Sequence, residues 1–507
     1  MTISARPATL SLLTLLFFGL PSTSRAAEVT SLADAGPGSL RQALLDAAAG
    51  STITFAPALF AGEGQAVLSL TSGPLTVAAA DVVVVGPGPD RLRLDGAGQP
   101  VAALPTAGLF DLPPVAFTLT GLSLAHASGS QGYGAIVARG SLTLERVVVY
   151  DCHSVGFNPG VYGGGAVLHL AGAQDGGTLT VVDSAFFDNR ADGSGAALWS
   201  DAAVVLQNVT LVGNRTSGMG QGGAVFLAPG ADAMLQHATL VGNWSGSAGL
   251  FVSLGARAEL VNSLVGNADN YFVEGHDVRC DGELVLDHST VTRLELGPGV
   301  EPVDLGGAAL DLALSLRCPV QAQDGGGMLV CELEPCSPAR DSADAGATLP
   351  TDARGIARPQ FAGPDRGAAE LAEVAPTITF GEQPPTGWED SDLVLQDAIS
   401  LADPTLCSTS ELTVTLALTD PTLGILVLAD PTGLSLVTGS GTSELRLRGT
   451  LETLSPWFGA GALDRVVVRP AKDFNDDWLP ELVLQVTDDN GARQASRTLP
   501  LVIRPSN

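Results

Sequence analysis

The chain has 507 residues with 25 basic and 54 acidic side chains, a net charge of −29 and a pI near 4.3. This charge excludes nucleic acid and anionic membrane surfaces as expected partners, because both repel an acidic protein. The length allows two or three domains and a substantial core.

The N-terminus has the pattern of a secretory signal peptide. Arg6 precedes an apolar stretch over residues 10–20, and Ser24-Arg25-Ala26 supplies a small-residue cleavage site, so we expect residues 1–26 to be removed. No other apolar run is long enough to predict a transmembrane segment in the mature chain. We therefore expect export to the extracellular space or to a bacterial outer surface.

A short amphipathic helix is expected soon after this leader. Ser39 and Gln42 have the spacing of a capping box, and Leu40 and Leu44 fall on one helical face. The first strand of an open strand stack exposes unpaired backbone groups, which such a helix can cover. The sequence therefore predicts an N-terminal helical cap.

One short pattern occurs four times between residues 179 and 267. In each copy a strand-like run ends in an aromatic residue or leucine, and an asparagine follows three residues later. The four asparagines are Asn189, Asn214, Asn243 and Asn267. Their spacings are 25 (214−189), 29 (243−214) and 24 (267−243). A strand-rich repeat with a period in the twenties is typical of an all-β solenoid, a parallel β-helix.

The asparagines are expected to form a ladder inside this stack. Parallel coils lie about 4.8 Å apart, so each amide can donate to one neighbour and accept from the next. We expect these residues to adopt a left-handed backbone at the turn and to point inward. A ligand site should then lie on the outward residues beside them, or in the C-terminal domain.

The regular spacing fades after residue 267. Residues 268–336 keep strand-like fragments and are expected to form atypical final coils. An exported protein can form disulfides, so we expect two bridges here, although spacing does not set their pairing. The cysteines of this part are Cys280, Cys318, Cys331 and Cys336. The turn-rich residues 337–371 are expected to close the second end of the stack.

The composition changes near residues 372–376. Seven short strand-like runs with Asp-Pro and Asp-Asn-Gly turns follow, which indicates a small β-sandwich over residues 376–507. Hard oxygen ligands of the kind that calcium prefers recur at its turns, although Asx turns on an acidic surface are the alternative. The possible calcium ligands are Asp390, Asp403, Asp473, Asn475 and Asp488.

Several motifs resemble known families. Gly-Gly-Ala-Val at 164–167 and 222–225, with Phe186-x-x-Asn189, resembles the repeats of polymorphic outer-membrane proteins and related right-handed parallel β-helix proteins. Gly-Ser-Leu-Arg-Gln-Ala at 38–43 looks like an entry motif that normally begins with cysteine and has glutamate in place of Gln42.

Residues 337–370 are similar to the closing segment of choice-of-anchor Q surface proteins. The matching residues are Ser-Pro-Ala at 337–339, Thr-Asp at 351–352, Arg-Gly at 354–355, Arg-Pro at 358–359, Asp365 and Gly-Ala at 367–368. The chain departs from that pattern at Arg340, Ala353 and Arg366. The resemblance implies a right-handed parallel β-helix over residues 27–371, with a closing segment over 337–371.

Residues 376–507 look like the cadherin-like or Ig-like modules of bacterial surface adhesins. These resemblances imply export and surface binding without a defined reaction. We therefore expect a structural or adhesion protein, acting as a monomer, whose β-helix displays a binding surface. Its expected partner is a surface glycan or a ligand on a host or neighbouring cell.

An enzyme is the alternative, because parallel β-helices also carry polysaccharide lyases and glycoside hydrolases. Four aspartates are expected close together along neighbouring coils, with Arg190 and Arg215 nearby: Asp183, Asp188, Asp192 and Asp201. Two of these aspartates could act as acid and base. Turn-forming roles compete with this assignment, because aspartate suits solenoid corners. Apart from calcium, no motif indicates a cofactor, and the histidine spacing does not indicate zinc.

Overall fold

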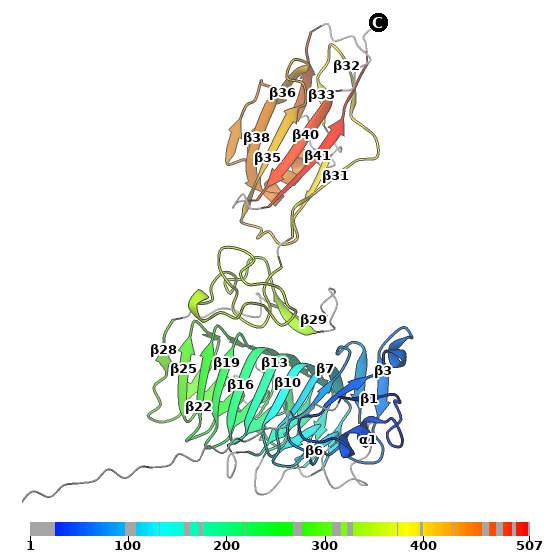
Figure 1. Cartoon of the computed structure of the whole chain (residues 1–507). Helices are drawn as coiled ribbons and strands as arrows, with labels where there is room; N and C mark the ends of the chain where they lie inside the picture. Colours follow the sequence, from blue (N-terminus) through cyan, green and yellow to red (C-terminus); the bar gives the residue numbers. More distant parts are fainter. Residues whose placement is uncertain are drawn as a thin grey trace, which may run out of the picture.

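The computed structural model describes residues 26–96, 108–130, 132–156, 163–171, 176–218, 220–266, 276–306, 316–321, 328–372, 374–395, 399–429, 431–458, 466–472, 480–488 and 493–504. Residues 1–25 of the expected leader lie outside these ranges, as do Asn267, Asp473 and Asn475. The described chain forms a stack of parallel strands followed by several smaller sheets, most of them antiparallel (Figure 1).

The stack confirms the predicted all-β parallel β-helix. In its largest sheet every strand is parallel to the next, because neighbouring strands come from successive coils. The main path comprises β1 (Ala26–Val29), β2 (Thr52–Phe55), β4 (Val82–Val85), β7 (Phe117–Ala125), β10 (Leu142–Tyr150), β13 (Thr178–Phe187), β16 (Ala203–Val212), β19 (Asp232–Gln236), β22 (Arg257–Val261), β25 (Glu283–Asp287) and β28 (Val303–Asp304). Beside it lie β3 (Ala66–Ser69), β5 (Leu92–Asp95), β20 (Thr239–Val241), β23 (Leu264–Gly266) and β26 (Thr290–Val291).

Two further parallel sheets complete the coils. The eight-stranded sheet comprises β6 (Phe110–Leu112), β9 (Ile136–Ala138), β12 (Val167–His169), β15 (Leu198–Ser200), β18 (Val225–Leu227), β21 (Ala248–Val252), β24 (His276–Cys280) and β27 (Leu294–Leu296). The four-stranded sheet comprises β8 (Ser128–Gly129), β11 (His153–Ser154), β14 (Arg190–Ala191) and β17 (Arg215–Thr216). Parallel pairing continues through β28, so the final coils are more regular than the fading sequence pattern predicted.

The core is built from inward aliphatic side chains that alternate with outward polar ones, as a period of two residues requires. Leu144, Val181 and Leu206 occupy one register position on three successive coils, and each is fully buried. Fully burying one such side chain contributes about 1.5–3 kcal/mol. The repetition of such rows along the stack holds the coils together.

The N-terminal helix α1 (Leu40–Leu45) adds Leu40 and Leu44 to this core beside β1. The Ser39 hydroxyl accepts the amide N–H of Gln42, which is the predicted N-cap bond. The Gln42 side chain donates instead to Asp46, so only half of the capping box forms. A one-turn 3₁₀ helix, η1 (Pro57–Phe60), follows β2.

The long strands bend at single residues with a left-handed backbone, and these residues stack in two rows. The first row, with φ angles, is Gly121 (68°), Arg146 (51°), Asp183 (45°), Asn208 (53°), His237 (50°), Asn262 (51°) and His288 (45°). The second is His126 (53°), Asp151 (50°), Asp188 (55°), Gly213 (67°) and Gly242 (64°). Gly, Asn, Asp and His are the residue types that tolerate this conformation best. Each row therefore marks one corner of the coil.

The ladder forms one position after the second row. The amide Nδ2 of Asn189 donates to Oδ1 of Asn214 at 2.9 Å, and Nδ2 of Asn214 donates to Oδ1 of Asn243 at 3.0 Å. All three side chains are at most 1 % exposed. They point inward as expected, but the left-handed residue is the one before each of them. The prediction of a left-handed asparagine was therefore wrong.

The segment from 328 to 371 does not close the end of the stack. It lies along the flank of the coils, where Asn208 donates to the carbonyl of Thr351 and Gln236 donates to that of Ala347 (Figure 1). Met328 and Val330 pack on Val148 and other outward side chains of the long strands. Its elements are β30 (Leu329–Leu333), antiparallel to β29 (Leu316–Gln321), and the 3₁₀ turn η4 (Ala345–Ala347). The expected end cap is thus a lateral clamp.

The last part of the described chain, which we call the sandwich, has its own core and antiparallel sheets, apart from the parallel pair of β32 and β42. The five-stranded sheet comprises β37 (Leu436–Thr438), β38 (Glu444–Thr450), β35 (Glu411–Leu418), β40 (Glu481–Thr487) and β41 (Gln494–Pro500). The smaller sheets comprise β33 (Leu393–Val394), β39 (Val466–Pro470) and β36 (Gly424–Leu428), then β31 (Thr377–Phe380) with β34 (Ile399–Ala402), and β32 (Thr386–Trp388) with β42 (Val502–Arg504). Helix α2 (Leu451–Phe458) follows β38.

Two disulfides form, but not in the predicted region alone. Cys318 pairs with Cys331 across the β29–β30 hairpin, and Cys336 pairs with Cys407 of the sandwich. Cys280 is instead a free buried thiol, because its β24 position points into the coil core. Among the described helices, none has the length and apolarity that crossing a membrane would require.

Candidate functional site

The outward residues next to the ladder form one continuous row, which we call the arginine strip. Its members are Ser128, His153, Arg190, Arg215 and Trp244, one from each of five successive coils. The ladder fixes their orientation, because an inward residue is followed by an outward one along an extended chain. Five side chains of four chemical types are thereby aligned along the axis of the stack.

The two arginines of the strip lie side by side in register. Arg190 is exposed and Arg215 is half-buried. Neither guanidinium forms a hydrogen bond or an ion pair with any described residue, although carboxylates outnumber basic groups about two to one in this chain. The strip therefore presents two adjacent positive charges that no described carboxylate hydrogen-bonds, although the carboxylate of Asp188 lies near both.

Asp192 lies at the corner that follows β14, where it joins two insertions. Its carboxylate accepts the N–H of Gly156 at 2.7 Å and the hydroxyl of Ser217 at 3.2 Å, and it lies 3.4 Å from Nε2 of His153. Partial burial alone would raise the pKa of this carboxyl, but these hydrogen bonds and the nearby His153 outweigh it and lower the pKa. Asp192 is thus an ionised anchor for the loops beside the strip.

Asp188 lies at the opposite corner, in the second left-handed row. Partial desolvation and the neighbouring carboxylate of Asp151 raise its pKa, while Arg215 and Arg190 oppose that shift. Asp183 lies at a different corner again, where its Oδ1 accepts Nδ2 of Asn208 at 2.9 Å. Burial raises the pKa of Asp183 despite that bond.

The three aspartates do not converge as an acid–base pair. Asp188 and Asp192 lie on either side of the two-residue strand β14, at two different corners of the coil. Asp192 is held by Gly156 and Ser217 at its own corner. Asp183 contacts Asn208 beneath the lateral clamp, away from Arg190. This arrangement favours structural roles for all three aspartates.

The possible calcium ligands are not gathered at one place among the described residues. Asp403 and Asp488 lie at the end of the sandwich nearest the clamp, whereas Asp390 follows β32, which pairs with the C-terminal strand at the opposite end. Between Asp403 and Asp488 lies Arg493. It donates to Asp488 Oδ2 at 3.1 Å and lies 3.9 Å from Asp403 Oδ1.

This guanidinium occupies the place where the sequence suggested a cation. It also lies over the ring of Phe361 in the clamp, 4.8 Å from the centroid, while Arg340 lies 3.6 Å from the same ring. The acidic turns of the sandwich therefore serve the junction with the clamp, through an arginine and the Cys336–Cys407 bond. The sequence pattern alone could not distinguish this from calcium ligation.

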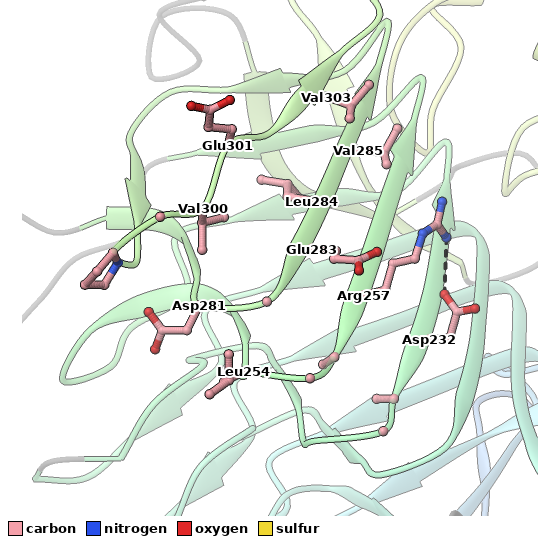
Figure 2. A pocket seen from close by; sticks show the side chains of 17 residues that line it. Asp232, Leu254, Arg257, Asp281, Glu283, Leu284, Val285, Val300, Glu301 and Val303 are labelled. Carbon is pink, nitrogen blue, oxygen red and sulfur yellow. Dashed lines mark hydrogen bonds and ion pairs between the residues drawn. The ribbon is translucent and has the colours of Figure 1, made fainter.

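A groove with a volume of about 760 Å³ lies at the corners of the last coils. Figure 2 shows the side chains that line it. It is rimmed by Asp281, Glu283 and Glu301, and Arg257 at its edge is already paired with Asp232 at 3.2 Å. Leu254 is 77 % exposed there. The described lining residues of the groove include carboxylates but no histidine, cysteine, serine or threonine, and its arginine is already paired.

An aromatic row on the eight-stranded sheet was not predicted. Trp199 and Phe226 stack with centroids 6.2 Å apart, Phe226 and Phe251 with centroids 5.2 Å apart, and Arg279 lies 6.0 Å from the ring of Phe251. Ring faces stacked on one another cannot also stack on a sugar. This row is therefore packing of successive coils, and the repeat register of β15, β18 and β21 was the signal for it.

Asp287, His288 and Asp344 bring three possible metal ligands within 4.8 Å of one another. Asp287 Oδ1 already bonds Nδ1 of His288 at 2.7 Å, and Asp344 Oδ1 accepts the N–H of Gly346. Sequence spacing missed the group, because Asp344 comes from the clamp and the other two from the last coils.

In comparisons with known proteins, no protein-family model matches the chain and no curated protein matches it significantly. The sequence predicted Arg190 as a candidate site residue and Arg215 only as a nearby residue. It did not identify His153 and Trp244 as members of the same row. The signal was present in the repeat itself, since Arg190, Arg215 and Trp244 each directly follow a ladder asparagine.

Proposed function

We propose that this is an exported structural or adhesion protein whose β-helix displays a glycan-binding face. The observation that carries the proposal is the arginine strip, an outward row of cationic and aromatic side chains on a rigid scaffold. The strip is flanked by insertions at 154–163 and 216–221, whose described ends are joined through Asp192. Two disulfides and the absence of a membrane-crossing helix among the described residues are compatible with export.

Rigidity supports a display role. The clamp ties the sides of successive coils together, and its bond from Cys336 to Cys407 fixes the sandwich to it. The clamp also contains a fully buried ion pair between Arg358 and Glu370 at 2.8 Å, which fixes the turns between them. A pair of this kind holds a unique geometry only while both partners are present.

The alternative is a polysaccharide lyase or glycoside hydrolase. Such chemistry would use Asp188, at the border of the strip, and Arg190, within it. Asp188 could act as the acid, because its carboxyl has a raised pKa. The carboxyl of Asp151 is the neighbour of Asp188, because it occupies the same corner row on the adjacent coil. We favour binding over turnover because the strip aligns cationic and aromatic side chains over several coils.

A glycan array of neutral and acidic oligosaccharides, probed with the intact mature protein, tests the proposal. Binding to at least one glycan class is expected. A parallel incubation with pectin and alginate, assayed for new reducing ends and unsaturated products, tests the alternative. Turnover that Asp188→Ala abolishes would replace the adhesion role with an enzymatic one.

A further inference from the structure

We propose that the arginine strip binds an acidic polysaccharide through its uronate carboxylates, with the sugar chain lying along the axis of the β-helix. This inference rests on the proposed function and names the ligand class for the same face. It begins from charge. Arg190 and Arg215 occupy adjacent coils about 4.8 Å apart, so their like charges repel each other.

Neither charge is neutralised within the described chain. Asp188 lies near enough for both guanidinium groups to favour its ionised form, yet no ion pair within hydrogen-bonding distance links it to either arginine. Asp192 is committed to Gly156, Ser217 and His153. An anionic ligand can therefore form the ion pairs that the guanidinium groups of Arg190 and Arg215 do not form with described residues.

Carboxylate is the anion that suits this arrangement. The planar guanidinium donates two parallel N–H groups to a carboxylate, which gives directional recognition that a lysine lacks. The carboxylates of Asp151, Asp188 and Asp192 border the strip on its two corners and repel an anion that leaves the row. The surrounding acidity thus restricts the ligand to the line of the arginines.

The row has the dimensions of a site for a chain rather than for a single sugar. From Ser128 to Trp244 it crosses four coil spacings, about 19 Å in all. Trp244 is half-buried beside Arg215 and adds an apolar surface of the kind on which sugar rings pack. Ligand groups at successive coils can then meet histidine, two arginines and tryptophan in order.

The test is titration of the intact protein with oligogalacturonate by calorimetry, at low and at high salt. We expect saturable binding that weakens with salt, because exposed charges are screened. The double variant Arg190→Gln/Arg215→Gln should bind roughly a hundredfold more weakly, since each charge-assisted contact is worth about tenfold. Arg446→Gln is the matched control, an exposed arginine on β38 of the sandwich, and should bind like the wild type.

Further arms separate the explanations. Arg190→Lys/Arg215→Lys keeps the charge and should recover only part of the affinity if the guanidinium fork matters. Equal affinity of wild type and double glutamine variant would overturn the inference, as would tighter binding of a sulfated oligosaccharide of equal charge. A protein that binds neutral glycans on the array but no uronate would retain its adhesion role and lose this inference. A protein that binds no glycan at all would lose both.

Discussion

Replacing Asn214 with alanine is expected to destabilise the β-helix by about 4 kcal/mol. The Oδ1 of Asn214 accepts two hydrogen bonds from Asn189, and the two hydrogens of its Nδ2 serve three acceptors, Oδ1 of Asn243 and the carbonyls of Phe186 and Val212. Its removal leaves the buried backbone N–H of Asn189 without an acceptor, which costs about 1–3 kcal/mol, and the loss of the bonds to Asn243 and Phe186 costs about 1 kcal/mol each. No water can enter readily, because the site is fully buried.

The assay is hydrogen exchange measured by mass spectrometry. In a solenoid each coil is stabilised by its neighbours, so the exchange rate of peptides around the mutated coil reports the local loss of stability. Peptides from β13 and β16 should exchange much faster in Asn214→Ala, with a matching loss in thermal stability. Gln207→Ala is the control on the preceding strand β16 of the same coil, since it removes only one bond between half-buried amides, to Gln236. If both variants lost the same protection within about 1 kcal/mol, the ladder would not hold the coils as described.

The remaining predictions concern the clamp and its junction. Arg358→Met should cost about 3–5 kcal/mol in unfolding free energy because it leaves Glu370 buried and unpaired, whereas Arg317→Met, at the exposed pair with Glu334, should cost about 1 kcal/mol or less by the same denaturant titration. Burial and the carboxylate of Glu370 raise the pKa of Asp365 from 3.8 to about 7, so the stability that this group contributes is present at low pH and is lost as pH rises through that window. The Asp365→Asn variant lacks this falling contribution, so its melting temperature should rise relative to that of the wild type as the pH increases across this range. Melting temperatures that change with pH in parallel for the two proteins would contradict the raised pKa of Asp365. Replacing both Cys336 and Cys407 with serine opens a loop of 71 residues and should lower the unfolding free energy of the clamp and sandwich by up to about 4 kcal/mol. A melting curve unchanged from that of the wild type would count against the disulfide fixing the sandwich to the clamp.

The sequence predicted the fold because one local rule recurs in four successive copies between residues 179 and 267. An aromatic residue or leucine faces inward, an asparagine follows three positions later, and both constraints arise from stacking of identical positions. The same rule orders the strip, since Arg190 and Arg215 each follow a ladder asparagine. The repeat did not predict which side chain, if any, pairs with each outward charged residue.

The clamp was misplaced because its position depends on contacts between residues far apart in the chain. Asn262 is buried at a corner of the stack, and its amide bonds the backbone of Asp344 and of Ala347. No periodicity predicts that a turn-rich segment will follow a row of corner residues instead of covering an end. Only the sum of these contacts, with the packing of Met328 and Val330, favours the flank.

The acidic turns of the sandwich show a second limit. Asp403 and Asp488 have the residue type and loop context that calcium uses. The nearby Arg493 can satisfy the same carboxylates, and it contacts both of them while lying on Phe361 of the clamp. A sequence pattern identifies the carboxylates, but it does not show whether a metal ion or an arginine side chain neutralises them.

The central claim is that the β-helix binds a glycan through an outward face without transforming it. One measurement addresses it directly: the intact protein is incubated with polygalacturonate, and bound polysaccharide and released products are quantified in the same sample over time. The account predicts stable retention, with no growth in reducing ends or unsaturated sugars. Steady product formation, lost in Asp188→Ala, or no retention of any acidic or neutral glycan, would contradict it.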